Sequence, residues 1–303
     1  MAARRRGWPE SKLLALASEV DRQINREALR RATLKAAAER TARDCYLLGK
    51  DHYQRGTEAD TRIAREMFDL ALAANPDYAA AYAWQAYAVQ RAITHRWGKP
   101  DGQAARDLAL RLARQAVQLA PDSPLCLGRL AFVLVLHQRW DEAVNVARAA
   151  LQTGRPIYVA TRADCADVLS AAGHAEEAVG VMREGLALEP HARPAFRAVL
   201  GRALLLAGKL EEALAELQWC AARLPDYAPC YFALVVALTE AGRMEEAGRA
   251  VRELLRLQPD PVARNHSGMC FFRQDAEFER FRSAVIAARA HALGPVMESS
   301  GPA

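Results

Sequence analysis

Apolar and small residues recur along most of this chain in a pattern about 34 residues long. Within each period, apolar positions three and four residues apart alternate with charged ones, which predicts two amphipathic helices joined by a turn. In the clearest period, Leu200 and Leu204 share a helix face, Gly208 supplies the turn, and Glu211 and Ala213 open the second helix. The small residues that open the second helices are Ala64, Ala109, Ala143, Ala178, Ala213 and Ala247, at spacings of 45, 34, 35, 35 and 34.

A helix pair of this length cannot bury its apolar face alone, so neighbouring pairs must stack and share one core. The pattern predicts an all-α fold, a right-handed α-solenoid of about six helix–turn–helix repeats over residues 42–260. An insertion near 92–104 holds Trp97 in a turn-rich stretch. A basic helical segment over 1–41 precedes the repeats, and a capping helix with a short disordered tail follows over 261–303.

Both ends of the predicted solenoid carry apolar stripes at helical spacing. At the C-terminal end, Phe278 and Phe281 begin a stripe that predicts a cap over residues 274–292. At the N-terminal end, two interpretations remain open: a cap for the first repeat, or a helix that binds a partner or a second copy of the chain. The N-terminal stripe consists of Leu13, Leu14, Leu16, Val20 and Ile24, and Val285 and Ile286 complete the C-terminal one.

The recurring turn and exit motifs resemble those of tetratricopeptide repeats. Leu210-Glu211-Glu212-Ala213 and Pro225-Asp226-Tyr227 have counterparts in the other units, and the match covers about residues 42–260. This resemblance implies a non-enzymatic scaffold or adaptor. More narrowly, Glu19–Leu48 and Cys270–Phe281 are similar to the C-terminal repeat module behind bacterial class III nucleotide cyclase and winged-helix regulator domains. That likeness implies a stand-alone regulatory module acting on a separate chain.

Charge and cysteine content narrow the classes of partner. The net charge is +5, and residues 1–50 contain twelve basic and six acidic residues, so the repeats themselves are nearly neutral. Because the N-terminal charges alternate in sign, nucleic acid is not the expected partner. The six cysteines show no metal-binding or redox spacing, which indicates free thiols, and no apolar run is long enough to span a membrane. We expect a cytoplasmic protein.

Residues that could carry catalysis occur without the context that catalysis needs. The paired glutamates, such as Glu211-Glu212, stand at helix starts, where the helix dipole stabilises negative charge. The seven histidines are scattered. The sequence therefore predicts no enzyme activity, no cofactor and no metal site.

A binding surface is expected where the first helices of successive repeats line a concave groove. The repeat phase predicts an apolar, aromatic groove that binds an amphipathic helix or an apolar peptide. Lys50 is the only close match to a carboxylate-binding lysine, so a terminal-carboxylate clamp is not expected. The predicted groove residues are Arg43, Tyr46, Lys50, Tyr53, Tyr87, Gln90, Phe132, Val135, Asp167, Arg202 and Phe232.

Overall fold

Helices make up the regular structure of the described part of the chain. The computed structural model describes residues 10–95, 97, 102–258, 261 and 272–293, and of residues 10–14 and 18 it describes the backbone only. No strand occurs within these ranges. The chain divides into two compact units, Met1–Cys165 with Arg183–Ala192 and Ala166–Met182 with Arg193–Ala303.

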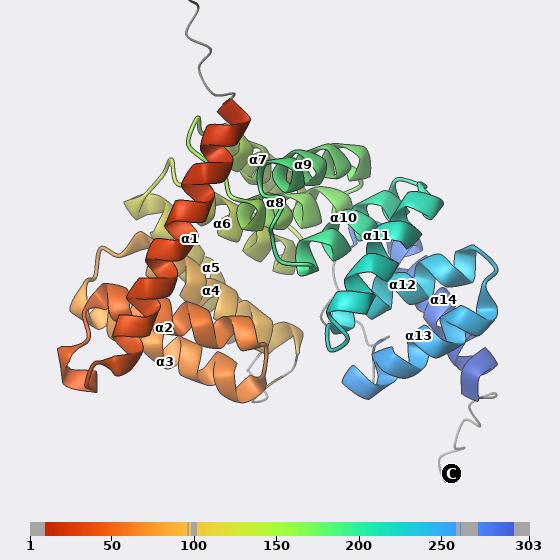
Figure 1. Cartoon of the computed structure of the whole chain (residues 1–303), viewed down its shortest axis with the longest axis horizontal. Coiled ribbons are helices and arrows are strands. Elements are labelled where there is room, and N and C mark those ends of the chain that lie inside the picture. The colour runs from red at the N-terminus through yellow and green to blue at the C-terminus, as the bar shows by residue number, and fades with distance from the viewer. Residues whose placement is uncertain (1–9, 96, 98–101, 259–260, 262–271, 294–303) are drawn as a thin grey trace, which may run out of the picture. The chain divides into compact units, whose positions relative to one another are not determined.

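The first unit is built from helix pairs that stack on one another (Figure 1). Within each pair the two helices pack together, and the first helices of successive pairs, α2, α4 and α6, also contact each other. These first helices therefore form one layer. Its elements are α1 (Glu10–Leu34), a 3-10 turn (Ala37–Glu39), α2 (Ala42–Arg55), α3 (Glu58–Ala74), α4 (Ala79–Thr94), α5 (Gly102–Leu119), α6 (Pro124–Leu136) and α7 (Trp140–Leu151).

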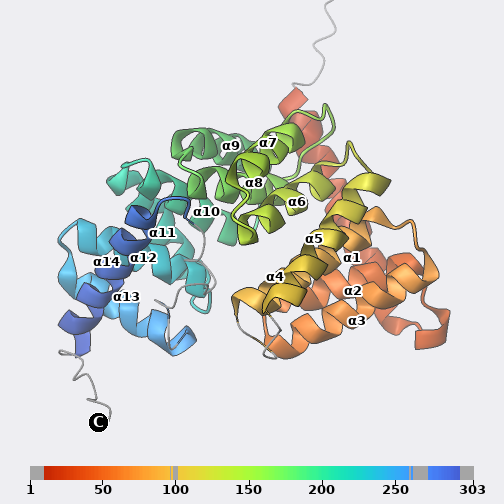
Figure 2. The ribbon, with the colours of Figure 1, turned by 180° about the vertical axis from the view of Figure 1, so that it is seen from behind.

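The second unit repeats the same arrangement and ends in a cap (Figure 2). The α10–α11 and α12–α13 pairs stack through α11 and α12, and α14 packs against both α12 and α13. Its elements are α10 (Ala195–Leu206), α11 (Leu210–Arg223), α12 (Ala228–Glu240), α13 (Met244–Leu257) and α14 (Asp275–Leu293). The division between the units passes through α8 (Val159–Ala171) and α9 (Ala175–Leu188).

Small residues set the close approach of paired helices, as the sequence predicts. All six alanines that open second helices are completely buried. A Cβ atom added to Gly49 would lie 2.6 Å from the Phe68 ring, and one added to Gly201 would lie 2.6 Å from Leu217 Cγ. Larger side chains at these positions would push the helices apart.

The predicted turns use a left-handed backbone residue between paired helices. Gly173, Gly208 and Gly242 have φ angles of 95°, 75° and 70°. At the corresponding turn between α6 and α7 stands Gln138, with a φ of 56°. Glycine adopts this conformation without the steric cost that a Cβ atom imposes, so this turn is strained relative to the other three.

The C-terminal cap is confirmed, and the N-terminal helix differs from a simple cap. Phe278, Phe281 and Val285 of α14 are buried. In α1, by contrast, Leu16 and Ile24 are about half exposed, at 50% and 51%. The helix faces the unit with its other side, where Ala32 is completely buried.

Polar contacts hold α1 against the first unit. The Tyr158 hydroxyl donates a hydrogen bond to Asp21, and Arg22 donates one to the carbonyl of His191. The apolar stripe Leu16, Val20 and Ile24 therefore does not cover the first repeat. Several predicted features lie outside the described residues: the side chains of Leu13 and Leu14, residues 96 and 98–101 of the insertion, the Cys270-Phe271 dipeptide and the predicted disordered tail.

Candidate functional site

Aromatic side chains from α2, α4 and α6 form a continuous row on the layer of first helices. The Tyr53 and Tyr87 ring centroids lie 5.3 Å apart, and Tyr87 meets Phe132 edge to face at 5.4 Å. Trp84 packs edge-on against Tyr53 at 5.3 Å. Edge-to-face packing of this kind is favourable because a positive ring edge meets a negative ring face. The row joins three successive repeats.

A buried arginine lies within this row. The Arg129 guanidinium lies 3.7 Å from the Tyr87 ring centroid and 4.4 Å from that of Trp84. Its Nη1 donates to Asp164 Oδ1 at 2.8 Å, and the two side chains are only 4% and 7% exposed. The Tyr87 hydroxyl donates to the same carboxylate oxygen at 3.2 Å. Burial lowers the pKa of Arg129, but the Asp164 carboxylate and the Tyr87 and Tyr53 side chains together outweigh burial, so the net pKa is raised and the side chain stays charged.

Two further cations lie over aromatic rings of the same row. The Lys50 ammonium is 5.3 Å from the Tyr46 ring centroid and 5.5 Å from that of Trp84. Arg91 covers the Tyr53 ring at 3.4 Å and donates a hydrogen bond to the Tyr53 carbonyl. No described carboxylate forms an ion pair with Lys50 or Arg91. Burial, and then the nearby Arg129 charge, lower the pKa of Lys50.

We call this set the aromatic–cationic face: Tyr46, Lys50, Tyr53, Trp84, Tyr87, Arg91, Arg129, Phe132 and Asp164. Three cations face one carboxylate, so the set carries an excess of two positive charges. Tyr46, Lys50, Tyr87, Arg91 and Phe132 are half-buried and present part of their surface to solvent. The face is thus both aromatic and basic, whereas the sequence predicts an apolar, aromatic groove.

The structure brings together five of the predicted groove residues of the first unit and separates three. Tyr46, Lys50, Tyr53, Tyr87 and Phe132 belong to the aromatic–cationic face, with Tyr53 buried at its base. The other three differ in environment: Gln90 and Val135 are buried in the core, and Arg43 is exposed outside this set.

The predicted residues of the second unit make no comparable face. Arg202 and Asp167 form an ion pair with each other, so neither charge remains for a ligand. Burial raises the pKa of Asp167, and the Arg202 charge opposes that rise. Phe232 is 1% exposed and stacks on Phe281 of α14 at 6.0 Å, so it belongs to the core beneath the cap and not to a surface.

Four members of the face are absent from the sequence prediction: Trp84, Arg91, Arg129 and Asp164. Trp84 and Arg129 each stand three residues before a predicted aromatic, Tyr87 and Phe132, so the i, i+3 spacing is the signal that could have found them.

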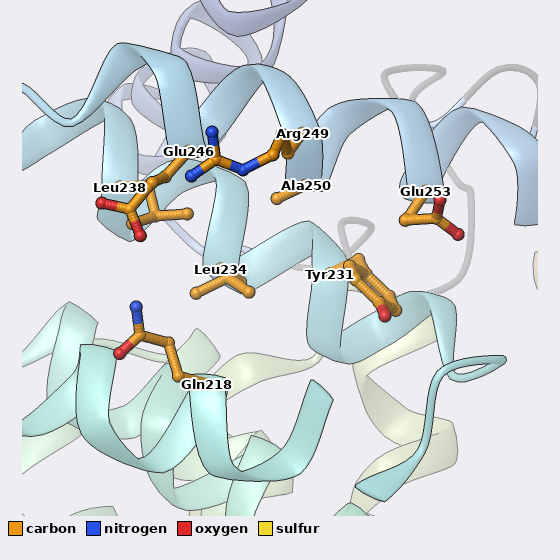
Figure 3. Close-up of a pocket in the computed structure, with 8 residues that line it drawn as sticks. All are labelled: Gln218, Tyr231, Leu234, Leu238, Glu246, Arg249, Ala250 and Glu253. Carbon is orange, nitrogen blue, oxygen red and sulfur yellow. The ribbon is translucent and has the colours of Figure 1, made fainter. Parts of the chain in front are cut away.

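The second unit contains a separate, shallow pocket of about 210 Å³ between α11, α12 and α13 (Figure 3). Leu234, Leu238 and Ala250 supply apolar surface, and Gln218 extends from α11 toward Leu238. Charged residues line the rest of it: Glu246, Arg249 and Glu253, together with Tyr231. Glu246 is already bonded to Arg243, and Glu253 to Arg256.

Neither a metal centre nor a membrane span is found in the described part of the chain. No group of three His, Cys, Asp or Glu side chains there could hold a metal ion. None of the described helices is both long enough and apolar enough to cross a bilayer. The paired glutamates lie in the first turns of α9, α11 and α13, as expected from the helix dipole.

Comparison with solved structures agrees with the stacked helix pairs. The tetratricopeptide protein TTC0263 of Thermus thermophilus aligns with a TM-score of 0.51 at 22% identity, over 65% of this chain and 98% of that one. The Cut9–Hcn1 assembly aligns at 0.56 and 14% identity, over 91% of this chain and 46% of the other. Human IFIT1 bound to m7Gppp-AAAA aligns at 0.59 and 18% identity, over 83% and 58% of the two chains.

These likenesses define the fold class. The chain has the all-α tetratricopeptide-type fold, in which stacked helix pairs make repeating units. No family model matches the sequence, and no curated protein matches it. At these identities the neighbours establish the fold alone.

Proposed function

We propose that this protein is a non-enzymatic interaction scaffold whose aromatic–cationic face binds a peptide segment of a partner. The observation that carries the proposal is the pair of half-buried cations, Lys50 and Arg91, which lie over aromatic rings and form no ion pair with any carboxylate that the structure describes. Burying an ammonium group without a counter-ion is unfavourable, so a ligand that supplies negative charge would gain more there than at an exposed lysine.

The chemistry of the face specifies the segment. The Tyr53–Tyr87–Phe132 row offers apolar contact, and the excess positive charge favours acidic side chains. We therefore propose an amphipathic helix or extended peptide that carries apolar and acidic residues together. This narrows the expectation of an amphipathic helix or an apolar peptide by adding acidic side chains to the ligand. Aromatic and arginine side chains are also the residue types that contribute most to binding energy at protein interfaces.

The test uses a displayed peptide library selected against the wild-type protein and then sorted against Lys50→Glu. The proposal expects enrichment of peptides with Asp or Glu beside apolar residues, and at least tenfold weaker binding to Lys50→Glu. Arg62→Glu is the matched control, because Arg62 is 71% exposed on α3. Phe132→Glu should also abolish binding while circular dichroism shows unchanged helix content. Peptides without acidic residues that bind Lys50→Glu as well as wild type would refute the proposal.

The regulatory alternative remains a prediction about the identity of the partner. If the chain regulates a nucleotide cyclase or a transcription regulator, the same face is the surface we would test first. Adding this protein to such a partner should then change the partner's activity, and Lys50→Glu should reduce that change. A homodimer through α1 is likewise a prediction, tested by sedimentation of Val20→Glu beside the wild type.

A further inference from the structure

Two cations of the aromatic–cationic face have no counter-ion among the residues that the structure describes. The Lys50 ammonium, on α2, donates no hydrogen bond to a described residue, and its contacts are the Tyr46 and Trp84 rings. Arg91, on α4, donates to the Tyr53 carbonyl and lies on the ring of the same tyrosine. Both side chains are half-buried, so each charge has lost part of its water without gaining an anion.

The two uncompensated charges lie over adjoining rings. Lys50 is 5.5 Å from the Trp84 ring centroid, Arg91 is 3.4 Å from that of Tyr53, and the two centroids are 5.3 Å apart. Like charges repel more strongly where water is partly excluded. In agreement, burial and then the nearby Arg129 charge lower the pKa of Lys50. An anion with two charges would relieve this repulsion at a single point.

We propose that Lys50 and Arg91 together receive a phosphate group, carried on a serine, threonine or tyrosine side chain of the bound peptide. The inference rests on the proposed function, because it names the anionic group of that peptide. A phosphate monoester carries about −1.5 to −2 charges at pH 7 and has three acceptor oxygens. One phosphorylated side chain therefore matches two cations, whereas a carboxylate supplies a single charge.

The donors of the face suit an anion with several oxygens. The Lys50 ammonium has three N–H donors, and the Arg91 guanidinium keeps donors beyond the one that the Tyr53 carbonyl accepts. Arg129 is too buried to meet the ligand directly, at 3% exposed, and its charge is held by Asp164. Donors from α2 and α4 would thus bind different oxygens of one phosphate.

The charge distribution favours a phosphopeptide over a nucleic acid. A nucleic acid strand gains affinity by placing many phosphates on many cations. The repeats beyond residue 50 are nearly neutral, so the excess positive charge is local to this face. Beside it, Tyr87 and Phe132 offer aromatic surface that apolar residues next to the phosphorylated side chain would cover. One dianion with apolar neighbours fits both parts of the face.

The test uses the full chain, immobilised, and three synthetic peptide libraries that differ only at a fixed central residue. That residue is phosphoserine, aspartate or serine, and the flanking positions are degenerate. Mass spectrometry quantifies the retained peptides. The phosphoserine library should be retained about tenfold more than the aspartate library, because it offers a further charge and a third acceptor oxygen.

Variants of the two cations then test the site itself. Lys50→Met and Arg91→Gln should each lower retention of the phosphoserine library about tenfold, with unchanged helix content by circular dichroism. Lys50→Arg, which keeps the charge, should keep the preference for phosphoserine. Arg62→Gln, on the exposed side of α3, is the matched control and should bind as the wild type does.

The outcomes separate this inference from the proposed function. Equal retention of the phosphoserine and aspartate libraries, with both dependent on Lys50, would overturn the phosphate assignment and leave the proposed function standing. Retention of the serine library at the same level, independent of Lys50, or retention of no library, would overturn both. A single-stranded oligonucleotide that binds more tightly than the phosphoserine library, with the same dependence on Lys50, would overturn the peptide as the source of the phosphate.

Discussion

The Arg129–Asp164 pair allows a sharp test of how burial changes the contribution of an ion pair to the unfolding free energy. Asp164→Asn keeps the shape of the side chain and removes its charge, leaving the Arg129 guanidinium 3% exposed without a counter-ion. Breaking a buried ion pair on one side costs about 3–5 kcal/mol of unfolding free energy. Because the amide oxygen can still accept from Arg129, we expect about 3 kcal/mol, near the lower end of that range.

The same unit supplies a matched control. Arg155 and Asp122 likewise form an ion pair between residues far apart in the sequence, 33 positions, but both side chains are 58% exposed. Asp122→Asn should therefore cost less than about 1 kcal/mol. The two substitutions make the same chemical change in the same type of ion pair. The difference between their losses of unfolding free energy therefore measures the effect of burial.

The assay is urea unfolding followed by circular dichroism and tryptophan fluorescence at neutral pH. The double variant Arg129→Met/Asp164→Leu should regain much of the lost unfolding free energy, because it leaves no uncompensated buried charge. If Asp164→Asn costs no more than Asp122→Asn, the reasoning from burial is wrong.

Three other changes follow from the packing, the turns and the charges. Ala213→Leu should overpack a completely buried helix crossing and lower the unfolding free energy by about 1–3 kcal/mol. Ala215→Leu, on the exposed side of α11, should change the unfolding free energy little. Equal urea midpoints for the two variants would contradict the repeat phase. Gln138→Gly should stabilise the protein by about 0.5–1 kcal/mol by relieving the left-handed turn, a gain that Gln138→Ala in the same denaturation assay should not show. The pKa of Lys50 in the folded protein lies below the ordinary 10.5, so folding favours loss of this proton. The unfolding free energy should therefore rise with pH between the folded-state pKa and 10.5. If wild type and Lys50→Met differ in unfolding free energy by the same amount at pH 7 and pH 10, this reasoning is wrong.

Much of the fold was predictable because its signals are local and repeated. The alanines at the helix crossings, the prolines after each pair and the glycines at the turns each report a backbone requirement that recurs in phase. Gln138 shows the limit of that reasoning, since the third repeat reaches the same left-handed turn without glycine. The neighbouring repeats determine the backbone conformation of that turn, and the intrinsic conformational preference of the residue does not.

The candidate site was less predictable because it depends on which residues meet across repeats. Asp164 and Arg129 lie 35 positions apart, and the sequence contains no sign that they pair. The repeat phase selects Tyr87 and Phe132, whose rings meet edge to face, yet it also selects Phe232, which packs on Phe281 of α14. A terminal cap changes the environment of the last repeat in a way that an average repeat cannot reveal.

The start of α2 has a consequence for how the protein can be dissected. The Thr41 side chain accepts from the Asp44 backbone amide, and the Asp44 carboxylate accepts from the Thr41 backbone amide, so α2 begins with its own capping box. Since Leu16, Val20 and Ile24 of α1 are about half exposed and do not cover the first repeat, removing α1 should expose little of the core of that repeat. A shortened chain that starts at residue 36 and keeps the intact repeats therefore separates the folding of the repeats from any activity of α1.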